Sequence, residues 1–320
     1  MTITANTFPD NMAQMMGILE AFSGVGFMAG PPLGGLLYSI GGYKLPFLVL
    51  GGISLATILV NVFLLPSVGV EQTQTGSIKN MLLIPAFYPV AIGVVVGSAC
   101  LGFLDPTLSL HLSSFNLSPS LVAVAFLLIG GMYAVTSPIW GYIADKKKCT
   151  KIMMVLGYYV STICYLLLGP SPILKLPNDL WIVILALGLT GLSLGSALMP
   201  AFLDLFLSAS WYGFPDDLST QGVVSGLFNS LFSLGGFLGP LLGGYLVQRF
   251  DFPWASTIFA AANLFVVLLI CLFSLWEYRC GKGRRLPWIK FNEGSSSEEQ
   301  EPLLANNASG SSSPEKSINV

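Results

Sequence analysis

The stretch GVGFMAGPPLGG (24–35) carries five glycines and two prolines inside an apolar run that otherwise is typical of a membrane helix. The pattern recurs as SLGGFLGPLLGG (233–244), shifted by 209 residues (233 minus 24). Small residues every three or four positions let two helix backbones approach closely, and neighbouring helices can satisfy the backbone group that a proline leaves free. We predict that both stretches are closely packed gating helices; ordinary close packing without a gating role is the alternative. The matched gating candidates are Gly26 and Gly235, Gly30 and Gly239, Pro31 and Pro240, Gly34 and Gly243, and Gly35 and Gly244.

Composition places the chain in a membrane. Of the 320 residues, 53% are hydrophobic and 9% are charged, and the mean hydropathy is +0.74. Soluble domains carry about 25% charged residues. The net charge of −2 argues against nucleic acid as a partner, and one histidine with five scattered cysteines predicts neither a metal site nor a cofactor. The absence of a nucleophile–base pair or a phosphate loop argues against an enzyme.

Eight apolar runs are long enough to cross a bilayer, which takes about 20 helical residues. They lie near 14–40, 45–66, 82–112, 119–143, 151–169, 180–208, 220–249 and 254–278. The two glycine-rich stretches fall in the first and the seventh of these runs. An offset of six helices is typical of bundles built from two related six-helix halves. Most basic residues fall in connections and a tail that would share one side, so the positive-inside rule predicts a cytosolic C-terminus.

Both glycine stretches have the form G-x-x-x-G-P-x-x-G-G, and this resembles the antiporter motif of the major facilitator superfamily. GYIADKKKCTK (141–151) is similar to that family's G-x-x-x-D-[RK] loop, with Asp145 and Lys146 at the matching spacing. FLDPTLSLHLSSFNLSPS (103–120) resembles the seventh helix of its vesicular amine transporters. The resemblance covers about residues 1–280 and is nearest to the vesicular polyamine transporter branch. It implies an all-α polytopic fold of twelve transmembrane helices, in which the motif lies on the fifth helix.

That alignment implies that this chain lacks the first four helices and holds eight of twelve. Residues 1–66 would be helices five and six of the N-terminal half, and 67–81 would be a cytosolic linker. Residues 82–280 would be the complete C-terminal half, and 281–320 would be a disordered cytosolic tail, rich in Ser, Glu and Asn. Because the substrate site of this fold lies between the halves, we expect that the chain alone does not transport.

Three acids lie well within the spans, and a carboxylate there is costly unless it is paired, protonated or facing water. We predict that Glu20 binds an ammonium group or a proton, and that its repeat mate Asn229 offers neutral hydrogen bonds; the vesicular monoamine transporters that the chain resembles have an essential aspartate at that second position. Asp105 and Asp204 are further candidates for substrate or proton binding. The alternatives are a hydrogen bond to a polar residue of the first half for Glu20, a local helix cap for Asp105 and a place near the cytosolic end for Asp204.

Other residues carry weaker signals. Asp145 and Lys146 resemble the family's cytosolic latch, which holds one conformation by charge pairs. Four tyrosines could surround an amine, although packing or an interface belt would also explain them: Tyr133, Tyr158, Tyr159 and Tyr165. In the tail, Glu299, Leu303 and Leu304 resemble an acidic dileucine signal, which implies a sorting adaptor as partner and an endosomal, lysosomal or secretory-vesicle membrane as location.

Together these features predict a secondary active transporter that exchanges protons for polyamines or monoamines across the bilayer of acidic vesicles. The expected partners are the lipid bilayer, a small organic cation and protons. Two alternatives stay open, a broad drug/proton antiporter and a membrane fragment that does not transport.

Overall fold

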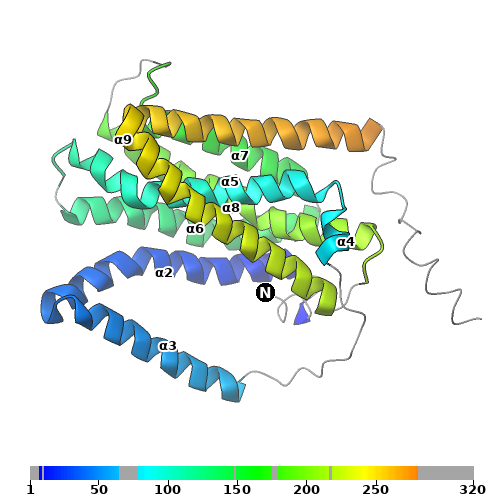
Figure 1. The fold of residues 1–320 in the computed structure, drawn as a ribbon, viewed down its shortest axis with the longest axis horizontal. Helices are drawn as coiled ribbons and strands as arrows, with labels where there is room; N and C mark the ends of the chain where they lie inside the picture. Colours follow the sequence, from blue (N-terminus) through cyan, green and yellow to red (C-terminus); the bar gives the residue numbers. More distant parts are fainter. Residues whose placement is uncertain are drawn as a thin grey trace, which may run out of the picture.

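The chain folds into a bundle of long helices, as expected (Figure 1). A computed structural model describes residues 7–8, 11–64, 78–117, 119–147, 149–174, 179–215 and 218–279, and no strand is present among them. The longer helices are α2 (Met12–Gly41), α3 (Lys44–Leu64), α5 (Phe87–Ser113), α6 (Pro119–Lys147), α7 (Thr150–Leu168), α8 (Leu180–Trp211) and α9 (Leu218–Arg279). One short helix, α4 (Ile78–Leu82), precedes α5.

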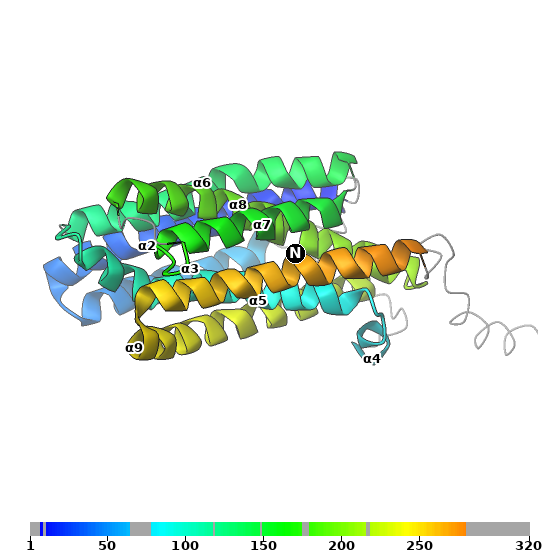
Figure 2. The same ribbon diagram turned by 90° about the horizontal axis from the view of Figure 1, so that it is seen from above.

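Helix α9 consists of two arms that double back on each other (Figures 1 and 2). Asp251 has φ 65° and ψ 165°, which is not helical, and it separates the two arms. Proline at 253 suits this kink because it donates no backbone hydrogen bond. The arms correspond to the expected spans 220–249 and 254–278, so each of the eight expected spans is helical in the described part of the chain.

The helices suit a lipid environment. Six of the described helices are long and apolar enough to cross a membrane, and α2, although it has 30 residues, is not one of them. Helix α3 is apolar but has no buried residue. Its side chains are exposed; Phe63, for example, is 85% exposed and Leu64 is 74% exposed. Such a continuous apolar surface would be unfavourable in water. Helices satisfy their backbone groups internally, which is what a hydrocarbon environment requires.

The core lies among α5, α7, α8 and α9. The most extensive helix contacts join α5 with α9, α2 with α6, and α7 with α8. Tyr158 and Tyr165 of α7 and Phe103 of α5 are fully buried there. Helix α2 joins this core chiefly along α6, and α3 contacts mainly α2. The first two long helices are therefore the least enclosed part of the bundle.

The third expected span begins later than the pattern 82–112 indicated. Helix α5 starts at Phe87, after a turn that contains Pro85. Pro89 is tolerated in the first turn of α5 because the first backbone N–H groups of a helix have no intrahelical partner. The sorting residues Glu299, Leu303 and Leu304 lie outside the described residues, as do 67–77 of the expected linker and the whole expected tail, 281–320.

Candidate functional site

A cavity of about 810 Å³ lies between α2, α5, α6 and α9. Its apolar wall includes Phe126 and Ile129 of α6 and Phe232 of α9. The described residues that line it include two acids and no base. The larger polar side chains at its surface are Glu20, Ser23, Ser98, Asp105, Ser109 and Tyr133. The cavity therefore carries a negative potential in an apolar setting.

Glu20 links α2 to α6. It lies on α2, and its Oε2 accepts a hydrogen bond of 3.2 Å from the hydroxyl of Tyr133 on α6. Tyr133 is 8% exposed, so its hydroxyl is held in place by the core around it. A hydrogen bond to a charged acceptor in such a setting contributes about 1.5–3 kcal/mol. The donor does not lie in residues 1–66, where the alternative placed the partner of Glu20, but on another helix that also lines the cavity.

Asp105 enters the same cavity from α5. The helix continues through Pro106, whose nitrogen cannot donate to the carbonyl of Gly102. Gly102 also lines the cavity, so an acceptor without its usual helical donor lies in the wall one turn before the carboxylate. Residues 98, 102, 105 and 109 are spaced by three or four positions and form one face of α5.

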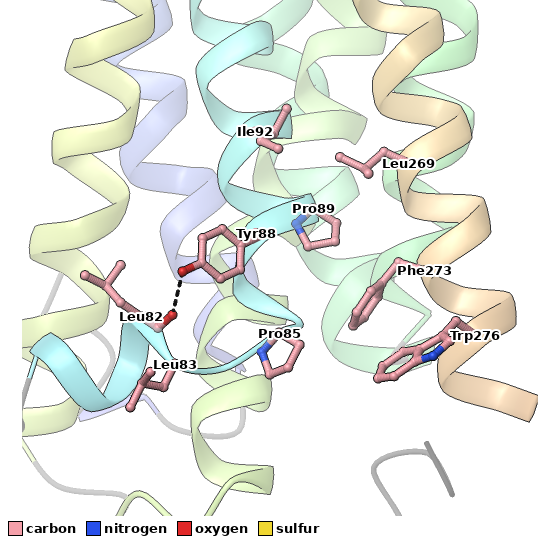
Figure 3. A pocket seen from close by; sticks show the side chains of 9 residues that line it. All are labelled: Leu82, Leu83, Pro85, Tyr88, Pro89, Ile92, Leu269, Phe273 and Trp276. Carbon is pink, nitrogen blue, oxygen red and sulfur yellow. Dashed lines mark hydrogen bonds between the residues drawn. The ribbon is translucent and has the colours of Figure 1, made fainter. Parts of the chain in front are cut away.

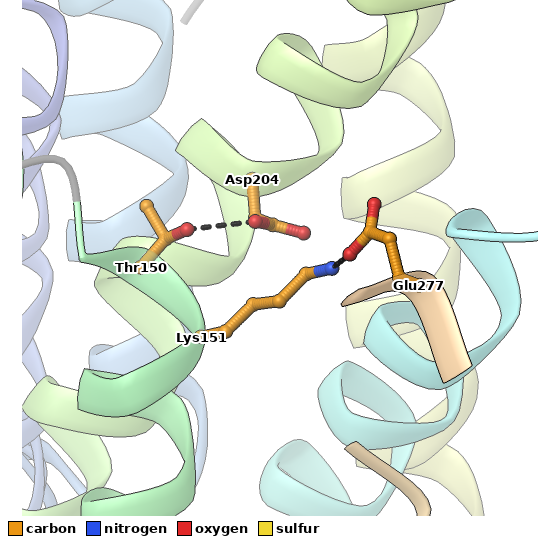
Figure 4. A network of polar contacts seen from close by, with 4 residues as sticks. All are labelled: Thr150, Lys151, Asp204 and Glu277. Atoms are coloured by element: carbon orange, nitrogen blue, oxygen red, sulfur yellow. Dashed lines mark hydrogen bonds and ion pairs between the residues drawn. The ribbon is translucent and has the colours of Figure 1, made fainter. Parts of the chain in front are cut away.

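Asn229 and Asp204 are not among the residues that line the cavity. Asn229 is exposed on α9, and its Nδ2 donates to the carbonyl of Ser225 in its own helix at 2.9 Å. Asp204 of α8 is fully buried and accepts a hydrogen bond of 2.7 Å from Thr150. Figure 4 shows it beside the ion pair between Lys151 of α7 and Glu277 of α9. Asp204 therefore belongs to a group of polar contacts, formed with Thr150, Lys151 and Glu277, that joins α7, α8 and the end of α9. We call this group the brace.

Asp145 binds the start of α2. Its carboxylate oxygens accept hydrogen bonds from the backbone N–H groups of Ala13 (3.0 Å) and Gln14 (2.7 Å). A carboxylate at this position satisfies donors that the helix leaves free and interacts favourably with the helix dipole. Gly141 makes the approach possible, because a Cβ there would clash with the carbonyl of Ala13.

Lys146 takes no part in that contact. Its Nζ donates to the hydroxyl of Tyr142 at 3.3 Å and lies 5.5 Å from the centre of that ring. The partner of Asp145 is thus a helix N-terminus 131 and 132 residues away in the chain, rather than a charged side chain. We refer to this region as the Asp145 end of the bundle.

The second glycine stretch is tightly packed at three of its positions, whereas a Cβ added at Gly244 would meet no heavy atom within 4 Å among the described residues. A Cβ added at Gly235 would collide with Ser98 and with the carbonyl of Val95, and one at Gly239 with the carbonyl of Ala99. One at Gly243 would lie 2.5 Å from the ring of Phe103. All of these contacts are with α5. Glycine is required along this stripe because any side chain would separate the two helices.

The first glycine stretch is open. A Cβ added at Gly26, Gly30, Gly34 or Gly35 would meet no heavy atom within 4 Å among the described residues. Gly26 and Gly30 line the cavity instead. Helix α2 runs unbroken through the two prolines and packs on α6 through a different face. There, Cβ atoms at Gly17 and Gly24 would meet Ser137 and Ala134 of α6.

Sequence reasoning found only part of the polar wall that α5 and α6 provide, namely Asp105 and Tyr133. Of the four tyrosines, Tyr133 lines the cavity; Tyr158 and Tyr165 are fully buried in the core, and Tyr159 is 51% exposed. The serines at 98 and 109 were missed, although their spacing from Asp105 on a helix was a usable signal. The partner of Glu20 carried no such signal, because it depends on how α2 and α6 pack.

Comparisons with known proteins agree with this architecture. The chain is 40% identical over 307 residues to the MFS-type transporter SLC18B1 of Homo sapiens. The aligned region covers 95% of this chain and 66% of that protein. The Mus musculus protein of that name is 40% identical over 309 residues, with the same coverage. The synaptic vesicular amine transporter of Homo sapiens is 27% identical over 283 residues, covering 85% of this chain and 51% of that protein.

The chain thus spans slightly less than two thirds of the length of the first two relatives. The family model of the Major Facilitator Superfamily matches residues 1–215. That match includes the glycine-rich α2, both acids of the cavity and the Asp145 contact. With its helical bundle, its repeated glycine stretch and this match, the chain belongs to the Major Facilitator Superfamily.

Proposed function

We propose that this chain forms part of a secondary active transporter that exchanges organic cations, either polyamines or monoamines, for protons across a vesicle membrane. The observation that carries the proposal is the shared cavity in which Glu20 of α2 and Asp105 of α5 lie without a base among the described lining residues. A carboxylate within a membrane span is costly unless it faces water, is protonated or binds a cation. The amine relatives support a cationic substrate.

Competition for these carboxylates would couple the two fluxes. Each acid holds either a proton or an ammonium group, so loading the amine releases a proton into the cavity. Tyr133 donates to Glu20 and stabilises its charged form until an ammonium group replaces or joins it. The ring of Tyr133 and that of Phe126 offer apolar and cation–π contacts to the substrate.

The Asp145 contact supplies a gate. Its carboxylate joins α6, in the part expected to be the C-terminal half, to the first turn of α2. Breaking this contact would let the two helices separate at that end. Asn229 lies outside the cavity and would reach it only through a rearrangement of α9, whereas we assign Asp204 to the brace around Thr150 and Lys151.

The open glycine stretch supports the proposal that the transport site is incomplete in this chain. The repeat mate of that stretch packs on α5, so a further helix packing on Gly26, Gly30 and Gly34 would close the cavity wall on this side. We therefore propose that residues 1–66 complete their half only with helices that this chain does not contain. The chain alone would bind an amine but would not transport it, in line with the alternative of a non-transporting membrane fragment.

The proposed cellular location rests on the relatives and the tail. The vesicular and granule names of the amine relatives favour a vesicle membrane, and the dileucine pattern at Glu299, Leu303 and Leu304 would bind a sorting adaptor from the cytosolic side. A drug/proton antiporter is the second candidate, favoured by the large apolar share of the cavity wall.

The chain in proteoliposomes tests these proposals. Equilibrium binding and proton-gradient-driven uptake of labelled spermidine, serotonin and an apolar cationic dye would be measured side by side. We expect spermidine or serotonin to bind, Glu20→Gln to weaken that binding, and no uptake to exceed that of empty vesicles. Dye binding alone would favour the drug antiporter, and gradient-driven uptake by this chain would overturn the claim of an incomplete site.

A further inference from the structure

A second, apolar groove of about 510 Å³ lies on the side of the bundle at the Asp145 end (Figure 3). One wall is the segment from α4 into α5, with Leu82, Leu83, Tyr88 and Ile92. The other wall is one face of the last turns of α9, with Phe273 and Trp276. Figure 3 shows Phe273 and Trp276 on the α9 side of the gap, with Pro85 and Pro89 on the facing side and Tyr88 turned toward Leu82.

The groove faces the bilayer near its boundary with water. It involves the first turns of α5 and the last turns of α9, which both lie at the ends of apolar spans. Leu83 is 74% exposed, and Tyr88 and Trp276 are about half exposed. Tyrosine and tryptophan are enriched at the headgroup level of membranes. The groove therefore extends from that level into the hydrocarbon region.

Local contacts hold the groove open. The hydroxyl of Tyr88 donates to the carbonyl of Leu82 at 2.9 Å and ties α4 to α5 (Figure 3). Pro85 and Pro89 restrict the backbone between them. Lys151 lies 5.0 Å from the ring centre of Phe273, but Glu277 pairs with its charge. The wall is thus a preformed apolar surface whose nearest lysine on α7 is already neutralised.

One further cation belongs to α4, one turn before the segment that lines the groove. Lys79 precedes Leu82 by one turn of α4 and is exposed. The structure gives it no ion-pair partner among the described residues. An apolar groove with a lysine at headgroup level matches a lipid that carries both an acyl chain and a negative charge. A zwitterionic lipid would fill the groove without using the lysine.

We propose that this groove binds one acyl chain of an anionic glycerophospholipid, with the lipid phosphate paired to Lys79. The bound lipid fills the space between α4, α5 and α9 and fixes the short helix α4 against the bundle. This site is separate from the amine cavity, and none of the residues that line the cavity lines the groove.

Photo-crosslinking of the full chain tests the proposal. The probes are phosphatidylserine and phosphatidylcholine with a diazirine in the acyl chain, each added to phosphatidylcholine bilayers that hold the protein. We expect labels on 82–92 and 269–276, with phosphatidylserine labelling about fivefold above phosphatidylcholine, the factor that one lysine near the membrane surface supplies. Lys79→Glu should remove this preference while phosphatidylcholine still labels the groove.

Two controls separate a site from bulk lipid. Leu83→Trp should fill the groove and reduce labelling there, whereas Leu110→Trp, near the other end of α5 and 65% exposed, should not. Helix α3 has no buried residue and reports contact with bulk lipid. Equal labelling of α3, or equal labelling by both lipids in the wild type, would overturn the proposal. So would a rise in groove labelling when residues 281–320 are removed, because the tail would then be the occupant.

Discussion

Helix α2 and the first arm of α9 are two copies of one sequence pattern in two different environments. On α9, the glycines at 235, 239 and 243 form a stripe against which α5 lies at backbone distance. On α2, a Cβ at the matching glycines would meet no heavy atom within 4 Å among the described residues, and two of these glycines line the cavity between α2, α5, α6 and α9. The acids also differ, because Glu20 lies in the cavity and its mate Asn229 bonds to its own helix. The stripe on α9 packs against a helix, and this suggests that the matching stripe on α2 could also accept a helix.

The largest effect that distinguishes the two copies should come from the glycine stripes. Gly239→Leu adds a side chain where even a Cβ would collide with the backbone of α5, so α5 and α9 must separate. Overpacking of this kind costs about 1–3 kcal/mol or more. We expect a clearly lower melting temperature in detergent and loss of the monodisperse peak in size-exclusion chromatography.

Gly30→Leu is the matched control. The open copy offers space for the new side chain, and replacing a glycine inside a helix removes a cost of about 0.5–1 kcal/mol. We expect an unchanged or slightly higher melting temperature. Equal destabilisation by both variants would show that the two stripes are packed alike, and the comparison would fail.

The next effect concerns the acid positions. Glu20→Gln removes a charged partner for an ammonium group, which contributes about 1.5–3 kcal/mol, or roughly 10- to 150-fold in affinity. Asn229→Ala removes an amide that bonds within its own helix and should change amine affinity by less than about twofold. Isothermal titration of the reconstituted chain with spermidine measures both. A larger loss from Asn229→Ala would place the substrate on the α9 side.

A smaller effect is expected at the start of α2. Asp145→Asn weakens a charged cap on two backbone N–H groups, and losses of this kind cost about 1 kcal/mol. Hydrogen exchange across residues 12–20 should become faster. Lys146→Gln is the control, because Lys146 contacts Tyr142 on its own helix. If Lys146→Gln made exchange across residues 12–20 faster and Asp145→Asn did not, the lysine would be the latch.

The sequence allowed the helices to be predicted but not all of their partners. Hydrophobic length and the turn at RFDFP predicted the rods, and the repeat predicted that α2 and α9 are related. Periodicity within a helix shows a face, as for the residues around Asp105, but it does not identify the helix that covers it. The contacts of Asp145 with Ala13 and of Glu20 with Tyr133 each join residues more than one hundred positions apart. Such pairings depend on the three-dimensional packing of whole helices.

Asp204 shows a second limit. An acid inside an apolar span predicts a functional site on average, and its sequence neighbours did not distinguish a transport site from a structural one. The deciding fact is that Thr150, at the start of another helix, donates to its carboxylate. No sequence signal distinguished Gly26 and Gly30, which line a cavity, from their mates at 235 and 239, which contact a helix, because the matched positions hold glycine in both copies.

The account rests on one competition, that of an amine and a proton for the carboxylates of a single cavity. Titration of the reconstituted chain with spermidine in two buffers that differ in ionisation enthalpy measures it directly, since the difference in heat reports protons released on binding. We predict net proton release in the wild type that decreases in Glu20→Gln and disappears when Asp105→Asn is added. Binding with the same heat in both buffers, or no binding by the wild-type chain, would contradict the account.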